Sequence, residues 1–500
     1  MKANDFYKYI LSGVLILGAS ACEETFAPST AIEETSALTN AGDVETATIG
    51  TYAVLRNPSY VRSVHFLTEF PSDEVAQGQS SSDDLTRAYR YTHINTSSHC
   101  TNFWGQAYKV IAAANKIIAY VPDDASADLK QLKGENLYLR AMMHYNLVRV
   151  FGRPYPQGSG AGPGVPILRD GLSDEETTGL SRGSVKEVYD FVIADLLKAA
   201  DLMSVEKGNS FASKEVAYAL LSRVYLYKED NENAVKYADL VINSGRYSLL
   251  DGANFQGYFK MDPETNSETI MCIRHTKVQN QDFSAIGSMY FSGDVAGNPA
   301  GQGVSGWGEI YASEKLVNQY ALHPKDLRKS FITPYILNGV QQKNLKLTPQ
   351  TPMYYVNKYN LQESIINLSS PVYLRLAEMY LNRAEANAKL GKTAAALADV
   401  NIIRTRAGLD DALYTSVPAG KTALDIVLEE RWMELAFEGH RSYDLFRNNR
   451  SMIRNYPGTH SLNNTPTTNV NQTVPATDAR VIFFIPQSEI DKNSKLTQNP

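Results

Sequence analysis

The segment 371–409 constrains the fold most, because it has the pattern of two amphipathic helices joined by a tight turn. Apolar and small side chains recur at helical spacing from Leu374 to Ala388, and Gly391 follows as a glycine does at the end of a helix. A second helical stripe comes next, for which Thr393 is the expected N-cap. We therefore expect a helical hairpin in this segment.

The same pattern occurs once more, over residues 213–249. Ser222 and Ala234 stand twelve residues apart there, as Ala384 and Ala396 do in the later hairpin. Small residues at these positions allow two antiparallel helices to approach closely. The repeat fits the phase of the tetratricopeptide (TPR) helix-turn-helix unit of about 34 residues. Since one such hairpin cannot bury its own apolar face, the rest of the chain has to stack on these two.

The first 22 residues have the pattern of an export signal. Lys2 and Lys8 precede an apolar run that is too short to span a bilayer, and three small residues then precede Cys22. This ending resembles the lipobox of bacterial lipoproteins, in which the cysteine is lipidated and becomes the first residue of the mature chain. The alternative is an ordinary secretory signal cut after Ala21. We expect three segments, namely a signal peptide over 1–21, a lipidated tether over 22–42 and a folded domain over 43–500.

Composition excludes several classes of protein. The 500 residues are 43% hydrophobic and carry a net charge of −6, and no basic stripe stands out, which argues against binding to nucleic acid. After Cys22 only Cys100 and Cys272 remain, too few for a multi-cysteine metal site, and whether they pair stays open. We find no nucleotide, dinucleotide or metalloprotease fingerprint in its required context, so neither a cofactor nor a metal is expected.

Two long segments do not fit the helical pattern. TPR-like hairpins are expected near 134–203, 213–249 and 371–409, whereas residues near 66–102 and 250–370 read as long, polar, glycine-containing insertions. Loops of this length are commonly functional. Elsewhere the pattern predicts a strand over 268–274, one helix over 422–446 and a short strand before Pro486.

The insertions supply the side chains that a sugar-binding site needs. Aromatic rings stack on the apolar faces of sugars, and charged or amide side chains pair with the hydroxyls. Aromatic residues in a glycine-rich loop can equally be the anchor of that loop, so both interpretations stay open. Our candidate ligand-binding residues are Asp73, Asp84, Arg87, Tyr89, Tyr91 and Asn102 from the first insertion, and Tyr290, Trp307 and Tyr311 from the second.

Taken in order along the chain, these features resemble the SusD/RagB family of surface nutrient-binding lipoproteins. The resemblance rests on Cys22 and on the motifs FWGQAYKVIAAANKII, LYLRAMMHYNLVRVFGRPYP, AYALLSRVYLY, YLRLAEMYLNRAEANAKLG, LEERWMELAFEGHRSYDLFR and IPQSEIDKNSKLTQNP. It implies an all-α, SusD-like fold with TPR-like hairpins packed against an irregular ligand-binding half. It also implies a lipid anchor in the outer membrane and a SusC-like, TonB-dependent barrel as partner. Glu23 and Glu24 after the cysteine resemble the acidic tag of lipoproteins that face the cell exterior.

The alternative of an enzyme is not favoured. Glu430, Glu434 and Glu438 fall on one helical face, and paired carboxylates are what glycoside hydrolysis requires. However, Arg431 and Arg441 lie in the same stretch, so ion pairing explains the pattern without catalysis. We expect a binding protein for oligo- or polysaccharide, with Trp307 as the main platform. A peptide-binding lipoprotein of the RagB type with the same architecture is the second hypothesis.

Overall fold

The computed structural model describes residues 38, 40–77, 84–290, 306–337, 339–344, 350–460 and 471–500. The chain divides into two units, residues 1–44 and 45–500. The expected signal peptide, Cys22 and nearly all of the tether lie outside the described residues, as does most of the glycine-rich loop before Trp307.

The chain is mainly helical, so the prediction of an all-α fold is confirmed. The longer helices are α2 (Ala41–Leu55), α3 (Pro58–Glu69), α5 (Ser98–Tyr120), α6 (Ala127–Phe151), α8 (Val185–Leu202), α9 (Lys214–Tyr227), α10 (Asn231–Ile242), α13 (Glu314–Ala321), α14 (Leu376–Lys389), α15 (Thr393–Arg406) and α16 (Ala423–Glu434). The shorter helices are α4 (Asp84–Arg90), α7 (Asp174–Thr178), α11 (Gly252–Gln256), α12 (Gly287–Tyr290), α17 (Arg441–Arg447) and α18 (Gln487–Lys492).

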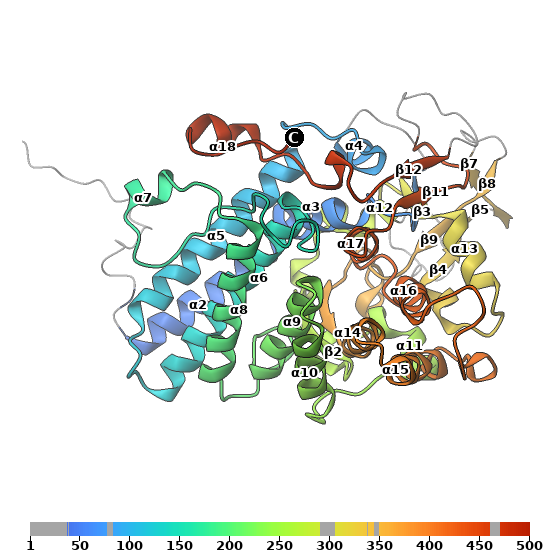
Figure 1. Cartoon of the computed structure of the whole chain (residues 1–500), viewed down its shortest axis with the longest axis horizontal. Helices are drawn as coiled ribbons and strands as arrows, with labels where there is room; N and C mark the ends of the chain where they lie inside the picture. Colours follow the sequence, from blue (N-terminus) through green and yellow to red (C-terminus); the bar gives the residue numbers. More distant parts are fainter. Residues whose placement is uncertain are drawn as a thin grey trace, which may run out of the picture. The chain divides into compact units, whose positions relative to one another are not determined.

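The strands are short and form antiparallel pairs rather than a common sheet. They are β1 (Val75–Gln77) with β3 (Ile310–Ala312), β2 (Thr269–Cys272) with β10 (Val372–Arg375), β4 (Ile332–Pro334) with β9 (Tyr354–Val356), β5 (Ile336–Leu337) with β6 (Val340–Gln341), β7 (Lys343–Asn344) with β8 (Thr351–Pro352), and β11 (Met452–Arg454) with β12 (Gln472–Val474). Most of them gather at the right side of Figure 1, beyond the helices. The predicted strand over 268–274 is confirmed as β2.

Helices that follow one another in sequence pack against one another in space. Helix α5 contacts α6, α6 contacts α8, α8 contacts α9, and α9 contacts α10. Helix α10 then contacts α14, which packs against α15 and α16 and continues the array in Figure 1. Helices α9 and α10 meet through Ser222 and Ala234, both fully buried, and the Ser222 hydroxyl donates a hydrogen bond to the Ala234 carbonyl at 3.1 Å. Ala384 and Ala396 are likewise fully buried between α14 and α15. Small side chains thus set the close approach in both hairpins.

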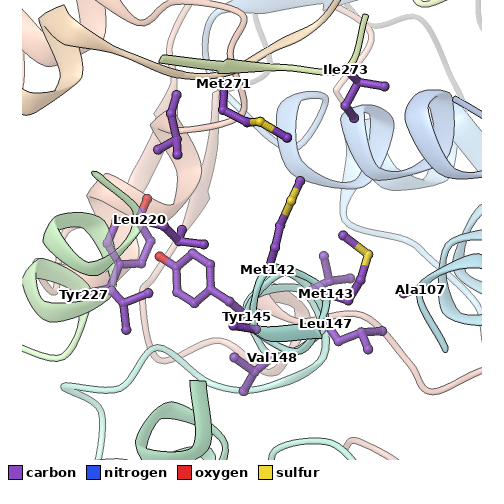
Figure 2. Packing of buried hydrophobic residues seen from close by; sticks show 14 of the residues in the cluster. Ala107, Met142, Met143, Tyr145, Leu147, Val148, Leu220, Tyr227, Met271 and Ile273 are labelled. Atoms are coloured by element: carbon purple, nitrogen blue, oxygen red, sulfur yellow. The ribbon is translucent and has the colours of Figure 1, made fainter. Parts of the chain in front are cut away.

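The main hydrophobic core lies between these helices and the paired strands β2 and β10. Figure 2 shows Met142 of α6 pointing toward Met271 of β2, with Tyr145 and Tyr227 beside them. Unbranched methionines fill irregular space well, which suits a junction between a helix layer and a short strand pair. This junction fixes the second insertion, which contains β2, to the helical array.

Several local predictions are wrong, each for a physical reason. The predicted helix over 422–446 is two helices, because Phe437 and Gly439 adopt positive φ angles of 66° and 72° between α16 and α17. Thr393 is not an N-cap, since the cap position of α15 is Lys392 with no side-chain hydrogen bond. No strand forms before Pro486; this part of the chain is extended and lies against α6 through Phe483.

The segment 66–102 is also more ordered than expected. It contains the end of α3, strand β1, helix α4 and the start of α5, and most of its described residues are buried. Its polar side chains are hydrogen-bonded inside the protein, which is how a polar sequence can be buried at little cost.

None of the helices in the described part of the chain combines the length and the apolar character that a membrane span requires.

Candidate functional site

Two exposed aromatic rings stand together in the second insertion. Trp307 precedes β3 and is 57% exposed, and Phe283 is 46% exposed in a single 3-10 turn over Asp282–Ser284. Their ring centroids are 5.6 Å apart with the planes at 79°, an edge-to-face arrangement. Large exposed aromatic side chains that pack on each other rather than into the core are unusual and mark a contact surface. We call this pair the aromatic platform.

The buried residue Ser288 holds both halves of the platform. Its hydroxyl donates to the Phe283 carbonyl at 2.7 Å, and its own carbonyl accepts the backbone N–H of Trp307 at 2.6 Å. Ser288 is fully buried in α12, which packs against β3 and β9. The two rings are therefore exposed, but the backbone that carries them is tied to the core, so the platform is formed in advance of ligand binding.

Polar groups lie next to the platform. Asp282 is exposed and adopts a positive φ of 45°, and the Asn280 amide donates to its carboxylate at 3.1 Å. The same amide donates to the Ile366 carbonyl at 3.1 Å, which fixes this turn to the chain that precedes β10. A carboxylate and an amide beside an aromatic face are the groups that pair with sugar hydroxyls.

The four predicted tyrosines are buried, which corrects the expectation that their rings are open to ligand. Tyr290 is fully buried, hydrogen-bonds to His65 at 2.7 Å and stacks on Tyr359 at 5.8 Å; burial also lowers the pKa of His65 to about 3. Tyr89 and Tyr91 bond to His460 and to the Pro71 carbonyl respectively. The ring of Tyr311 packs on the ring of Tyr355. All four rings are therefore packed inside the protein, and the hydroxyls of Tyr290, Tyr89 and Tyr91 are hydrogen-bonded there.

Asp73 is also buried, and its carboxylate is satisfied within the protein. It pairs with Arg441 at 2.7 Å and with Lys315 at 2.5 Å. Burial alone would raise its pKa, but these two cations outweigh burial and hold the pKa of Asp73 below its usual range. Asp73 therefore joins β1 to α13 and α17 rather than facing a ligand.

Three predicted residues of the first insertion lie at the surface. Asp84 accepts from the backbone N–H and the hydroxyl of Ser98 at 2.6 and 2.8 Å, and pairs with the partly exposed Arg87 at 3.2 Å. Asn102 is exposed one helical turn after Ser98 on α5. Within the described residues, no hydrogen bond, ion pair or ring contact joins this group to the aromatic platform. Its role in ligand binding stays a prediction.

The carboxylates of α16 and the following turn are ion-paired rather than free for catalysis. Glu430 pairs with Arg328 and Arg404 at 2.6 and 3.0 Å. Glu434 and Glu438 both pair with Arg375, at 2.6 and 2.8 Å. All three carboxylates are at least 95% buried, so water and substrate have no access to a pair of them. The geometry supports the structural interpretation over a glycosidase.

Metal and thiol chemistry find no support in the described residues. Among them, no three acidic, histidine or cysteine side chains are grouped so as to hold a metal ion. Cys100 and Cys272 are both buried and unpaired, which answers the question that the sequence left open. Burial raises the pKa of the Cys100 thiol to about 12, so it stays protonated and unreactive.

Comparisons with known proteins agree with this architecture. A family model described as "Starch-binding associating with outer membrane" matches residues 35–226, and the model of the SusD family matches residues 335–500. Together they match well over half of the chain. SusD-like proteins form a carbohydrate-binding family. The chain belongs to the SusD/RagB family.

Individual relatives cover nearly the whole chain. A SusD-like protein P2 of Formosa agariphila is 26% identical over 471 residues, covering 88% of this chain and 89% of that protein. A SusD superfamily structure from Bacteroides thetaiotaomicron is 28% identical, with a TM-score of 0.81 over 92% of this chain and 100% of that one. A laminarin-binding SusD-like protein shares the fold at 23% identity, with a TM-score of 0.70 over 93% of this chain and 100% of that one. The predicted SusD-like fold is thereby confirmed.

The sequence analysis named Trp307 but missed Phe283 and Ser288. The available signal for Phe283 was a single aromatic residue inside the otherwise polar run KVQNQDFS. Ser288 gave no signal, because its importance lies in a hydrogen bond to the backbone five residues earlier.

Proposed function

We propose that this protein captures oligo- or polysaccharide at the cell surface on the Trp307–Phe283 platform. The observation that carries the proposal is the pair of exposed, mutually packed rings held by the buried Ser288. An edge-to-face pair offers two ring surfaces at a steep angle to one another, which suits adjacent units of a twisted glycan chain. The neighbouring Asp282 and Asn280 supply the hydroxyl partners.

The family supports the glycan hypothesis in two ways. One matching family model describes starch binding in association with the outer membrane. A protein of the same fold binds laminarin, so the fold can carry a glycan site. We further propose that Cys22 carries the lipid anchor, that the protein faces the cell exterior, and that it passes the glycan to a SusC-like, TonB-dependent barrel.

Isothermal titration against a panel of polysaccharides and oligopeptides tests the ligand class. The Cys22→Ala variant produced without residues 1–21 is the suitable form, because it corresponds to the expected mature chain and cannot be lipidated at that position. Heat with one polysaccharide class supports the proposal, whereas heat with oligopeptides alone contradicts it and favours the peptide-binding hypothesis.

Membrane attachment and partnership are tested separately. In the native host, the unmodified protein should fractionate with the outer membrane and co-purify with a TonB-dependent barrel in mild detergent. The Cys22→Ala variant should leave the membrane fraction if Cys22 is the anchor. Recovery of the intact protein without any barrel would contradict the proposed partnership.

A further inference from the structure

A pocket that shares no lining residue with the aromatic platform lies where α2 ends, next to β2. It has a volume of about 630 Å³, within the range of small-molecule sites. Its lining mixes an apolar floor with a polar rim. The apolar side chains are those of Ile49, Tyr52, Leu55, Phe211, Met271 and Ile273. The polar rim includes Arg56, Glu264, Arg274 and Gln279.

The aromatic wall of the pocket is fixed in place. The Tyr52 hydroxyl donates to Glu135 at 3.1 Å and accepts the backbone N–H of Ala212 at 2.9 Å. This second bond ties down the loop that carries Phe211, whose ring meets Tyr52 edge to face at 5.1 Å. Phe211 stays half-buried and lines the pocket, and the ammonium of Lys207 lies over its ring at 5.4 Å from the centroid.

The guanidinium of Arg56 on the pocket rim has no ion-pair partner within the described residues. Arg274 pairs with Asp262 at 2.8 Å and with Glu264 at 3.8 Å, whereas the side chain of Arg56 has no hydrogen bond, ion pair or ring contact within the described part of the chain. The backbone of Arg56 is nevertheless fixed, since its carbonyl bonds to the His275 ring at 3.3 Å and to the Gln281 amide. A positioned, unpaired guanidinium binds carboxylate or sulfate with charge-assisted, often bidentate, hydrogen bonds.

The opposite part of the rim suits hydroxyl groups. Glu264 accepts a hydrogen bond from the Ser210 hydroxyl at 2.6 Å, which orients its carboxylate, and Gln279 lies on the same rim. Carboxylate and amide groups accept from and donate to sugar hydroxyls. The pocket therefore combines a ring surface, hydroxyl partners and, in Arg56, one guanidinium without an ion-pair partner in the described part of the chain.

We propose that this pocket binds a single sugar unit that carries an anionic group, either a carboxylate or a sulfate. The anion pairs with Arg56, the apolar face of the sugar ring packs on Phe211, and its hydroxyls meet Glu264 and Gln279. This site shares no named residue with the Trp307–Phe283 platform and does not rest on the function proposed for it.

Ligand-detected NMR titration of the Cys22→Ala protein tests the proposal with three probes. These are methyl glucuronoside, glucose 6-sulfate and the neutral methyl glucoside. The account predicts that at least one anionic probe binds about tenfold or more tightly than the neutral sugar, because a hydrogen bond to a charged group contributes about 1.5–3 kcal/mol. The preference should decrease in 0.5 M salt. Which anionic probe binds identifies the carboxylate or the sulfate as the recognised group.

Variants assign the binding to this pocket. Arg56→Gln should abolish the preference for the anion, and Phe211→Leu should weaken all three sugars alike. Lys198→Gln removes a comparable exposed charge on α8 and should change nothing, as should Trp307→Ala. Since the Arg56 side chain has no hydrogen bond, ion pair or ring contact within the described part of the chain, its substitution should leave the melting temperature nearly unchanged. Equal binding of neutral and anionic sugars, no binding of any probe, or an unchanged preference in Arg56→Gln would each overturn the proposal.

Discussion

Trp307 packs edge to face on Phe283, with ring centroids 5.6 Å apart, although both rings are about half exposed to solvent. Each ring limits the rotamers of the other, so the pair costs little conformational entropy when a ligand binds. Ser288 fixes the backbone beneath both rings from inside the core. The site is therefore a rigid surface feature, whereas the four predicted tyrosines are buried.

The two rings should contribute to glycan binding in a coupled way. Phe283→Ala removes both a ligand surface and the support for Trp307, so it should weaken binding by roughly 1–3 kcal/mol, and the effects of the two single substitutions should not add. A double-mutant cycle measured by titration calorimetry checks this. Strict additivity would show that the rings act independently and that their mutual packing has no role.

Close helix packing at Ser222 should be sensitive to size. Ser222→Leu forces extra volume between α9 and α10, where Ser222 is fully buried, and should lower the free energy of unfolding by about 1–3 kcal/mol or more. Ser222→Ala loses only the bond to Ala234 and should cost about 1 kcal/mol. Urea denaturation measures both, with Leu240→Ser on the exposed face of α10 as a neutral control. A stable Ser222→Leu variant would mean that the two helices are not tightly packed here.

The buried ion pairs around Arg375 should matter far more than surface pairs. Arg375 bridges Glu268, Glu434 and Glu438, all at most 5% exposed, and Arg375→Met would leave these charges without their shared partner. A loss of about 3–5 kcal/mol is expected. The exposed pair Lys186–Asp190 on α8 serves as the control, because Lys186→Met should change stability by less than about 1 kcal/mol. Equal effects would contradict the assignment of the network as scaffold.

Two buried carboxyl groups should make the stability of the folded protein decrease as the pH rises. Glu69 and Glu74 hydrogen-bond to each other and accept the backbone N–H groups of Gly439 and Phe437. Burial raises the pKa of both, and the charge of Glu69 raises that of Glu74 further. The folded state therefore holds protons that the unfolded chain releases above its ordinary carboxyl pKa of about 4.5, so this pair contributes less stability as the pH rises from 5 to 8.

Glu69→Gln should remove part of that dependence, because burial alone still raises the pKa of Glu74. The amide can still accept from Gly439 and carries no charge, so the variant should lose less stability than the unmodified protein between pH 5 and 8. Urea denaturation at both pH values measures the difference, and Glu175→Gln at an exposed position is the control. An identical pH dependence in the Glu69→Gln protein would show that the pair does not titrate in this range.

Helical periodicity and small-residue spacing predicted the scaffold well, because these patterns report directly on how helices pack. The capping box that starts α8, with Ser184 followed three residues later by Glu187, is likewise a pattern that the sequence displays directly. The helix break at Phe437 was not predictable, since a positive φ at a phenylalanine depends on Glu74 accepting its N–H from 363 residues earlier in the sequence. The sequence around Phe437 contains no information about a hydrogen-bond partner that lies so far away along the chain.

The binding site was predicted only in part for the same reason. The sequence left open whether the aromatic residues of the insertions anchor the loops or bind ligand; Tyr89, Tyr91, Tyr290 and Asp73 find partners from distant segments and are buried. Trp307 is exposed because the described loop offers it Phe283 alone as a ring partner. Composition indicated which residues could bind sugar, whereas burial decided which of them are accessible.

The most direct test of the central claim is the affinity of the Trp307→Ala protein for the polysaccharide that binds the unmodified chain, measured by titration calorimetry. Tyr120→Ala, which removes a 41% exposed ring on α5, is the matched control. The account predicts that Trp307→Ala weakens binding by tenfold or more, while Tyr120→Ala binds normally and both variants keep their melting temperatures. Unchanged affinity in the Trp307→Ala protein would place the glycan elsewhere and contradict the account.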